Sequence, residues 1–230
     1  MLGRLQEQLN KYFTASFVIL GLFLLTAIIV SPKGVFNYAT NNTPIGKADF
    51  SVFLNINNSH YLALNEIMIL LTEFGREVFW PITIILLFIL GGWTGKKTAV
   101  VIAISMLVLI PIGELAKDIV ARPRPVIPAS DFLISADKDY AFPSGHAVIV
   151  SAGATGALML FRGTPRRFVV STILAIEAAL VCLSRIYVGG HYPLDVIGGI
   201  LLGVGVSLIF VGVEKHIEFL FMPLKKLLRR

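Results

Sequence analysis

Six apolar segments, separated by short polar stretches, dominate the pattern of hydrophobic and polar positions along the chain. Each is close to the roughly 20 residues that an α-helix needs to cross the hydrocarbon core of a bilayer. A backbone in lipid must satisfy its own hydrogen bonds, and a helix does so within each segment. The pattern therefore predicts an all-α, polytopic membrane protein with six transmembrane helices. These lie at about residues 13–31, 71–92, 98–116, 145–162, 168–187 and 193–213.

Two features of the apolar segments predict details of their packing. Pro111 lies inside the third segment, and a proline in a helix interior predicts a kink or an early end there. The fourth and sixth segments are rich in small residues, with Ser151–Ala154 in one and Gly198–Gly205 in the other. Small side chains let helix backbones approach closely, so we expect both helices to lie at close helix–helix contacts.

The connections and the tail belong to the same single membrane domain, residues 1–230. In the long connection 31–70, the apolar clusters 49–54 and 61–64 predict either short interfacial amphipathic helices or a plain surface loop. The tail, residues 214–230, mixes apolar and basic side chains. We expect it to form a basic amphipathic helix on the anionic cytoplasmic leaflet.

Composition and charge agree with a membrane setting and predict an orientation. Hydrophobic residues make up 56% of the chain and charged residues only 15%, against about a quarter charged in soluble domains. Six spans place both termini on one side, and most Lys and Arg residues fall on that side. The termini are therefore expected to be cytoplasmic. The net charge of +6 does not indicate nucleic-acid binding, because no basic and aromatic soluble surface accompanies it.

Three cations at the ends of the predicted spans suggest a phosphate site. Guanidinium groups such as Arg124 and Arg185 match the geometry of phosphate oxygens, and Lys117 acts as a point charge. Each alone could be a cation reaching to the membrane surface, but three beside two histidines favour phosphate binding. Arg122 could be a fourth phosphate contact or could hold its loop to lipid headgroups.

The segment Pro143–His146 opens the fourth predicted span. Proline suits the first helical turn, and the free N–H groups there form an anion site. Ser144 can add a hydroxyl, and Gly145 allows the backbone to come close to a ligand. His146 is placed to protonate a leaving oxygen.

His191 and Asp195 are four residues apart at the start of the sixth predicted span. At that spacing on a helix, a carboxylate can hold one imidazole nitrogen and leave the other free to attack phosphorus. Pro193 between them suits the first turn of a helix. The alternative is a buried structural His–Asp pair.

Metal binding by His146, His191, Asp195 and Glu114 is the competing interpretation of these polar residues. The chain has no H-E-x-x-H motif, paired cysteines or multi-carboxylate cluster. Cations around the same pocket would repel a divalent ion. We therefore expect no catalytic metal and no cofactor.

The three clusters resemble the signature motifs of the type 2 phosphatidic acid phosphatase superfamily. They read Lys117-x6-Arg124-Pro125, Pro143-Ser144-Gly145-His146 and Ser184-Arg185-x5-His191-x3-Asp195. The resemblance covers about residues 70–213. It implies a six-helix membrane core with an extracytoplasmic site and metal-independent hydrolysis through a phosphohistidine. The same superfamily includes soluble vanadium haloperoxidases, which this composition argues against.

By motif match, the resemblance implies that His191 is the nucleophile, Asp195 its orienting partner and His146 the acid for the leaving group. The residues implied to cradle the phosphate are Lys117, Arg124, Ser144, Gly145 and Arg185.

The sequence thus predicts an integral-membrane lipid phosphate phosphatase. Phosphatidate, phosphatidylglycerophosphate and a polyprenyl (pyro)phosphate such as undecaprenyl pyrophosphate are the candidate substrates. A phosphotransferase using the same site is an alternative. A transporter or flippase of anionic lipids is disfavoured because the charges cluster at one membrane face.

Overall fold

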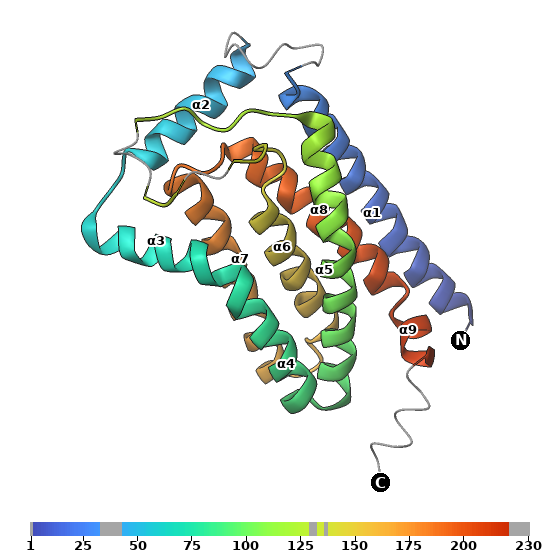
Figure 1. Ribbon diagram of the computed structural model, residues 1–230. Helices are drawn as coiled ribbons and strands as arrows, with labels where there is room; N and C mark the ends of the chain where they lie inside the picture. Colours follow the sequence, from blue (N-terminus) through green and yellow to red (C-terminus); the bar gives the residue numbers. More distant parts are fainter. Residues whose placement is uncertain (1, 33–42, 129–132, 136–137, 221–230) are drawn as a thin grey trace.

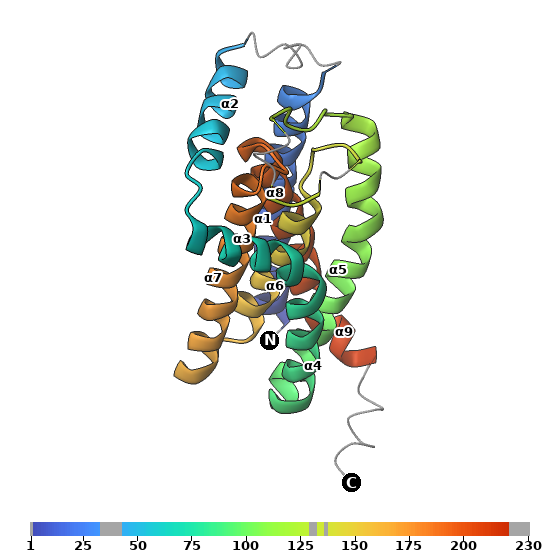
Figure 2. The same ribbon diagram turned by 60° about the vertical axis from the view of Figure 1, so that its left-hand side comes forward.

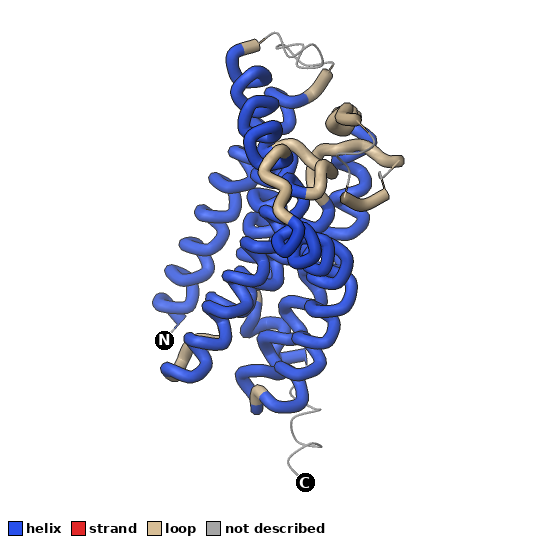
Figure 3. The backbone as a smooth tube through the Cα atoms, turned by 90° about the vertical axis from the view of Figure 1, so that its left-hand side faces the viewer, coloured by secondary structure: helices blue, strands red, loops and turns tan. Residues whose placement is uncertain are grey.

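The computed structural model describes residues 2–32, 43–128, 133–135 and 138–220, and within these ranges it contains helices and no strands (Figures 1 and 3). The all-α prediction is therefore confirmed. The elements are α1 (Leu2–Val30), α2 (Pro44–Asn57), α3 (Leu62–Phe74), a π-helical turn (Gly75–Phe79), α4 (Trp80–Leu90), α5 (Gly92–Val120), α6 (Gly145–Leu160), α7 (Pro165–Tyr187), α8 (Pro193–Gly212) and α9 (Glu214–Leu220).

Helix α6 lies at the centre of the bundle, and α5, α7 and α8 pack around it (Figures 1 and 2). Helix α1 packs along the outer side of α8. Every residue from Ala147 to Ala157 except Ile149 is buried. This helix can be enclosed on all sides because its side chains are mostly small, so neighbouring backbones come close.

The contact between α6 and α8 depends on glycine. A Cβ atom at Gly203 would lie 2.1 Å from Ser151 Oγ and 2.3 Å from the Val148 carbonyl oxygen. At Gly199 it would lie 2.7 Å from the carbonyl oxygen of Ser144. The close approach expected from the small residues of these two segments is confirmed.

Four helices are long and apolar enough to cross a membrane: Leu9–Val30, Gly92–Val120, Pro165–Tyr187 and Pro193–Gly212. Helix α6 is apolar but has only 16 residues. The chain is thus a polytopic helical protein, and the six-span count stays a prediction. Pro111 does not end α5 early, because the helix continues to Val120.

The predicted span 71–92 is not one straight helix. It contains the end of α3, the π-helical turn and α4, and the chain bends so that α3 lies across the bundle while α4 runs along it (Figures 1 and 2). A π-helical turn is a recognised cause of such a bend. A Cβ at Gly75 would lie 2.3 Å from Val181 Cγ2, so glycine allows this turn to press against α7.

The connection 31–70 contains helix where the structure describes it. Pro44 lies in the first turn of α2, and the hydroxyl of Thr43 accepts a hydrogen bond from the Gly46 N–H. Residues 49–54 are therefore helical rather than a plain loop, and Asp49 and Phe53 are buried against the bundle. The tail begins with α9. The expected amphipathic surface of residues 221–230 lies outside the described residues.

Candidate active site

The predicted site residues meet at the end of the bundle opposite the start of α1 and the end of α8 (Figure 1). This convergence follows from chain direction, because α5 and α7 end where α6 and α8 begin. The positions are Lys117 in the last turn of α5, Arg122 and Arg124 just beyond it, Ser144, Gly145 and His146 at the start of α6, Arg185 in the last turn of α7, His191 in the following turn, and Asp195 in the first turn of α8.

His191 is held by one backbone group and one cation. Its Nδ1 lies 2.8 Å from the carbonyl oxygen of Ala141, and its Nε2 lies 3.1 Å from Nη1 of Arg124. Nδ1 must carry the proton to donate to the carbonyl, so the lone pair of Nε2 accepts from the guanidinium. The side chain is only 2% exposed. Nε2 is therefore the nucleophilic nitrogen, and it points to a phosphate-binding cation.

Asp195 does not hold the imidazole in the way that we expected. Its Oδ2 lies 3.7 Å from Nδ1 of His191, beyond hydrogen-bond distance. Instead, Oδ1 accepts from Arg122 Nη1 at 2.5 Å, and Oδ2 accepts from the backbone N–H of Tyr192 at 2.9 Å. Asp195 thus braces the turn that carries His191, while the Ala141 carbonyl fixes the ring nitrogen. The spacing argument failed because His191 lies before the helix begins.

Arg122 joins three elements at the base of the site. Its Nη2 donates to Asp49 Oδ2 in α2 at 2.7 Å, and its guanidinium lies 4.2 Å from the centre of the Tyr192 ring. The other oxygen of Asp49 accepts from the Leu194 N–H at 2.9 Å. Arg122 is 1% exposed. It does not contact lipid headgroups, as one of our two interpretations required, and its hydrogen bonds to two carboxylates indicate a structural bridge.

A carboxylate that sequence reasoning missed joins two of the cations. Asp139 Oδ2 accepts from Lys117 Nζ at 2.5 Å, and its Oδ1 accepts from Arg124 Nη2. Lys117 also donates to Glu114 Oε1 at 2.8 Å. Burial by itself raises the pKa of Asp139, but the hydrogen bonds from Lys117 and Arg124 outweigh it and lower the pKa to about 2. An anion therefore already lies between the two cations.

The start of α6 supplies neutral donors. Ser144 is the N-cap residue and is fully buried, and its backbone N–H donates to the Asp195 carbonyl oxygen at 3.0 Å. Its hydroxyl has no hydrogen-bond partner within the described part of the chain. A buried hydroxyl at a helix N-terminus is suited to an anionic ligand. Arg185, 2% exposed, lies under Gly190, where a Cβ would be 3.1 Å from its Nη2.

His146 lies between the predicted cradle and α3. It interacts electrostatically with Arg185, Arg76 and His191 and hydrogen-bonds to the backbone of Thr72. The Thr72 hydroxyl is in turn 2.7 Å from that of Ser184.

Arg76 is a second residue that sequence reasoning missed. It lies in the π-helical turn, and its Nη1 would be 3.2 Å from a Cβ placed on Gly145, while Lys117 Nζ would be 3.8 Å away. The absence of a side chain at Gly145 thus lets two cations approach the same backbone turn. No sequence signal marked Arg76, because its position depends on the bend between α3 and α4.

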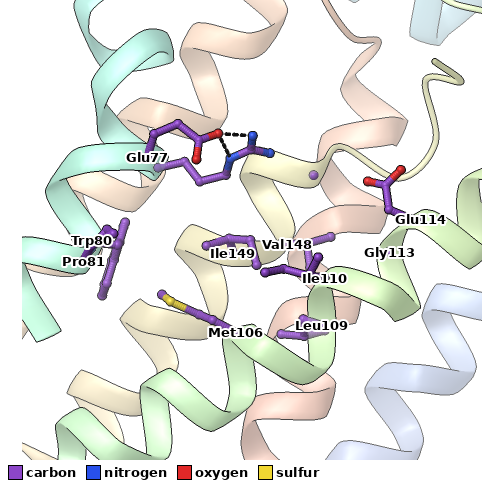
Figure 4. Close-up of a pocket in the computed structure, with 12 residues that line it drawn as sticks. Glu77, Trp80, Pro81, Met106, Leu109, Ile110, Gly113, Glu114, Val148 and Ile149 are labelled. Carbon is purple, nitrogen blue, oxygen red and sulfur yellow. Dashed lines mark hydrogen bonds and ion pairs between the residues drawn. The ribbon is translucent and has the colours of Figure 1, made fainter.

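A pocket of about 350 Å³ adjoins Gly145. Its polar end includes Arg76, Glu77 and Glu114, and its remaining walls are mainly apolar side chains of α4, α5 and α6 (Figure 4). Within the described ranges no three His, Cys, Asp or Glu side chains group as metal ligands. The arrangement suits an amphiphile with an anionic head and an apolar tail.

Comparisons with known proteins agree with this geometry. The family model described as the PAP2 superfamily matches residues 97–217. An undecaprenyl-diphosphatase of Sulfolobus acidocaldarius is 36% identical over 90% of this chain and 93% of its own length. The rat sphingosine-1-phosphate phosphatase 1 is 32% identical over 60% of this chain, and the match covers 32% of the rat protein.

A solved structure shares the fold. It is described as a transmembrane PAP2-type phosphatidylglycerolphosphate phosphatase from Bacillus subtilis, and it superposes with a TM-score of 0.66 at 24% identity. The alignment covers 88% of this chain and 96% of that one. The resemblance of the three motifs to this superfamily is therefore confirmed.

Proposed function

Because the chain belongs to the PAP2 superfamily, we propose that it is an integral-membrane lipid phosphate phosphatase that works through a phosphohistidine. The observation that carries this proposal is the orientation of His191, whose Nε2 faces the guanidinium of Arg124 at 3.1 Å. A nucleophilic nitrogen directed at a phosphate-binding cation suits in-line attack on phosphorus.

In the first half-reaction, the terminal phosphate of the lipid replaces the Asp139 carboxylate between Lys117 and Arg124. The Nε2 lone pair of His191 forms a bond to phosphorus, and the bond between phosphorus and the leaving oxygen breaks. His146 supplies a proton to that oxygen. The positive charge that develops on the imidazole is stabilised by the Ala141 carbonyl, which accepts from Nδ1–H at 2.8 Å.

In the second half-reaction, water attacks the phosphorus of phosphohistidine. The P–N bond breaks, its electron pair returns to Nε2, and inorganic phosphate leaves. Deprotonated His146 accepts the proton of the attacking water, which restores the starting state. This assignment uses only groups of the chain and needs no metal ion.

The substrate is a lipid whose phosphate lies at the bilayer surface. The name of the Sulfolobus relative supports a polyprenyl diphosphate such as undecaprenyl diphosphate, with phosphatidylglycerophosphate and phosphatidate as further candidates. The surplus of Lys and Arg on the side of the termini supports cytoplasmic termini and an extracytoplasmic site.

Purified protein in detergent with excess EDTA should release phosphate from at least one of these lipids. His191→Ala should reduce release to background, and His146→Ala should lower it about 10²- to 10⁴-fold. His216→Ala, an exposed histidine in α9 at the other end of the bundle, is the matched control and should keep full activity.

Trapping separates the proposed mechanism from direct attack by water. A substrate labelled in its terminal phosphate should transfer label to the parent protein under an alkaline quench, because phosphohistidine is stable to base. His191→Ala should stay unlabelled. Catalysis without protein-bound label, or full activity of His191→Ala, would refute the phosphohistidine. Label recovered on another lipid would identify a phosphotransferase.

A further inference from the structure

Arg76 is held at the edge of the site by the bend between α3 and α4. The π-helical turn that carries it is pressed against α7 at Gly75, where a Cβ would lie 2.3 Å from Val181 Cγ2. One turn earlier, the Thr72 hydroxyl is 2.7 Å from that of Ser184. Both contacts tie the turn to the helix that carries Arg185. π-Helical turns are frequent at functional sites.

The guanidinium of Arg76 lies directly beside the phosphate cradle. Its Nη1 and Lys117 Nζ both face Gly145, at 3.2 Å and 3.8 Å from the position of a Cβ there. Its Nε donates to Glu77 at 2.7 Å, and its Nη2 also pairs with that carboxylate. The side chain of Arg76 is 30% exposed and that of Glu77 57%. The exposed carboxylate can swing away when a more highly charged anion arrives.

The pocket places Arg76 between this cradle and an apolar wall. Trp80, Pro81, Met106 and Ile149 lie below Glu77 in Figure 4 and line the same cavity. A lipid with its tail in this pocket and its terminal phosphate in the cradle has its leaving group beside Arg76. In a diphosphate that leaving group is the second phosphate, whereas in a monophosphate ester it is an oxygen bound to carbon.

We propose that Arg76 binds the lipid-side phosphate of a lipid diphosphate, and so makes the enzyme prefer diphosphates to monophosphates of the same lipid. The inference rests on the proposed phosphatase function and specifies its substrate class. A planar guanidinium suits this role because it donates two parallel hydrogen bonds to phosphate oxygens.

The chemistry gives Arg76 a role in the transition state as well. As His191 Nε2 bonds to the terminal phosphorus, the bond from that phosphorus to the bridging oxygen breaks. The electron pair stays on that oxygen, which becomes a free oxygen of the departing lipid monophosphate. Arg76 stabilises the charge that develops there. A monophosphate ester presents no second phosphate, so its carbon-bound leaving oxygen depends on the proton from His146.

Two acidic side chains also face the pocket, and neither removes this preference. Glu114 accepts from Lys117 Nζ at 2.8 Å, and Glu77 is paired with Arg76 itself. Each acid is therefore already matched to a cation.

Farnesyl diphosphate and farnesyl monophosphate, which share one tail, test the proposal. Arg76→Gln should lower kcat/KM for the diphosphate about 10- to 100-fold, as expected for a lost charge-assisted hydrogen bond, and change it less than about threefold for the monophosphate. Arg76→Lys keeps the charge without the fork and should fall between. Arg166→Gln, an exposed arginine at the start of α7, should change neither.

Inhibition supplies a readout that does not depend on turnover rates. Pyrophosphate should inhibit the parent more strongly than orthophosphate does, and Arg76→Gln and Arg76→Lys should reduce this difference. Equal losses for both substrates, or an unchanged inhibitor ratio in both variants, would overturn the assignment of Arg76. A parent inactive on every lipid phosphate, with His191→Ala indistinguishable from it, would instead refute the proposed function and this inference with it.

Discussion

Removing Arg122 should destabilise the protein more than any other single change in the buried cluster at the base of the site. Arg122→Met keeps an unbranched side chain of similar reach and deletes the charge. Asp49 and Asp195, 5% and 0% exposed, would then be left as two neighbouring buried carboxylates. Asp49→Asn is the milder perturbation, because the amide oxygen can still accept from Arg122 and a one-to-one pair with Asp195 remains.

The magnitude follows from the number of partners lost. Breaking a buried ion pair by removing one member costs about 3–5 kcal/mol, and Arg122 serves two carboxylates at 2.7 Å and 2.5 Å. We expect Arg122→Met to cost about 4–5 kcal/mol, at the upper end of this range. Asp49→Asn replaces one charge-assisted hydrogen bond by a neutral one and should cost about 1 kcal/mol.

Equilibrium unfolding in mixed micelles, followed by tryptophan fluorescence, measures these differences. The double variant Asp49→Asn/Arg122→Met should be less destabilised than the sum of the single variants, with a coupling of about 0.5–3 kcal/mol. This is expected because neutralising Asp49 relieves the repulsion that loss of Arg122 creates. Arg122→Met within about 0.5 kcal/mol of the parent, or a strictly additive double variant, would refute the role of Arg122 as a buried bridge.

Three further predictions concern the cradle, the packing and the absence of a metal. Asp139→Asn should lower the inhibition constant of orthophosphate about two- to fivefold, because Lys117 and Arg124 lose a competing anion; unchanged inhibition would contradict this. The folded-state pKa of Asp139 lies near 2, below its unfolded value, so the stability that the carboxylate contributes is present above about pH 4 and is lost as the pH falls through 2. Melting curves of parent and variant should therefore converge in strong acid and not near neutrality. Gly203→Ala should cost several kcal/mol or prevent folding, since its Cβ would overlap α6, whereas Gly21→Ala, with nothing within 4 Å, should be neutral or stabilising by up to about 1 kcal/mol; size-exclusion profiles and melting temperatures compare them. Excess EDTA should leave phosphate release unchanged, and activity that returns only with added divalent ions would show that the cradle needs a metal.

Most of the cradle could be predicted from the sequence because its members are helix ends. Lys117 closes one apolar segment and Ser144 precedes the next, so successive crossings in opposite directions bring them to the same face. Turn chemistry at Pro143–His146 is likewise local. The expected direct hydrogen bond between His191 and Asp195 was wrong because it assumed a helix that starts only at Pro193.

The residues that escaped prediction are those whose partners are distant in the chain. Asp49 meets Arg122 across 73 residues, and Asp139 reaches Lys117 across 22. Arg76 comes beside Gly145 only because the helix bends at the π-helical turn. Neither hydropathy nor motif spacing encodes such pairings, since each depends on how the elements pack.

The sequence by itself determined the helical class, the membrane setting and the identity of the phosphate-binding residues, because hydropathy and turn chemistry act over one or two helical turns. The tertiary structure decided which groups orient His191, where the carboxylates lie among the cations, and that Arg76 belongs beside the site. The physical reason is that a buried polar group must find its partner wherever packing places it, and packing is a property of the whole chain.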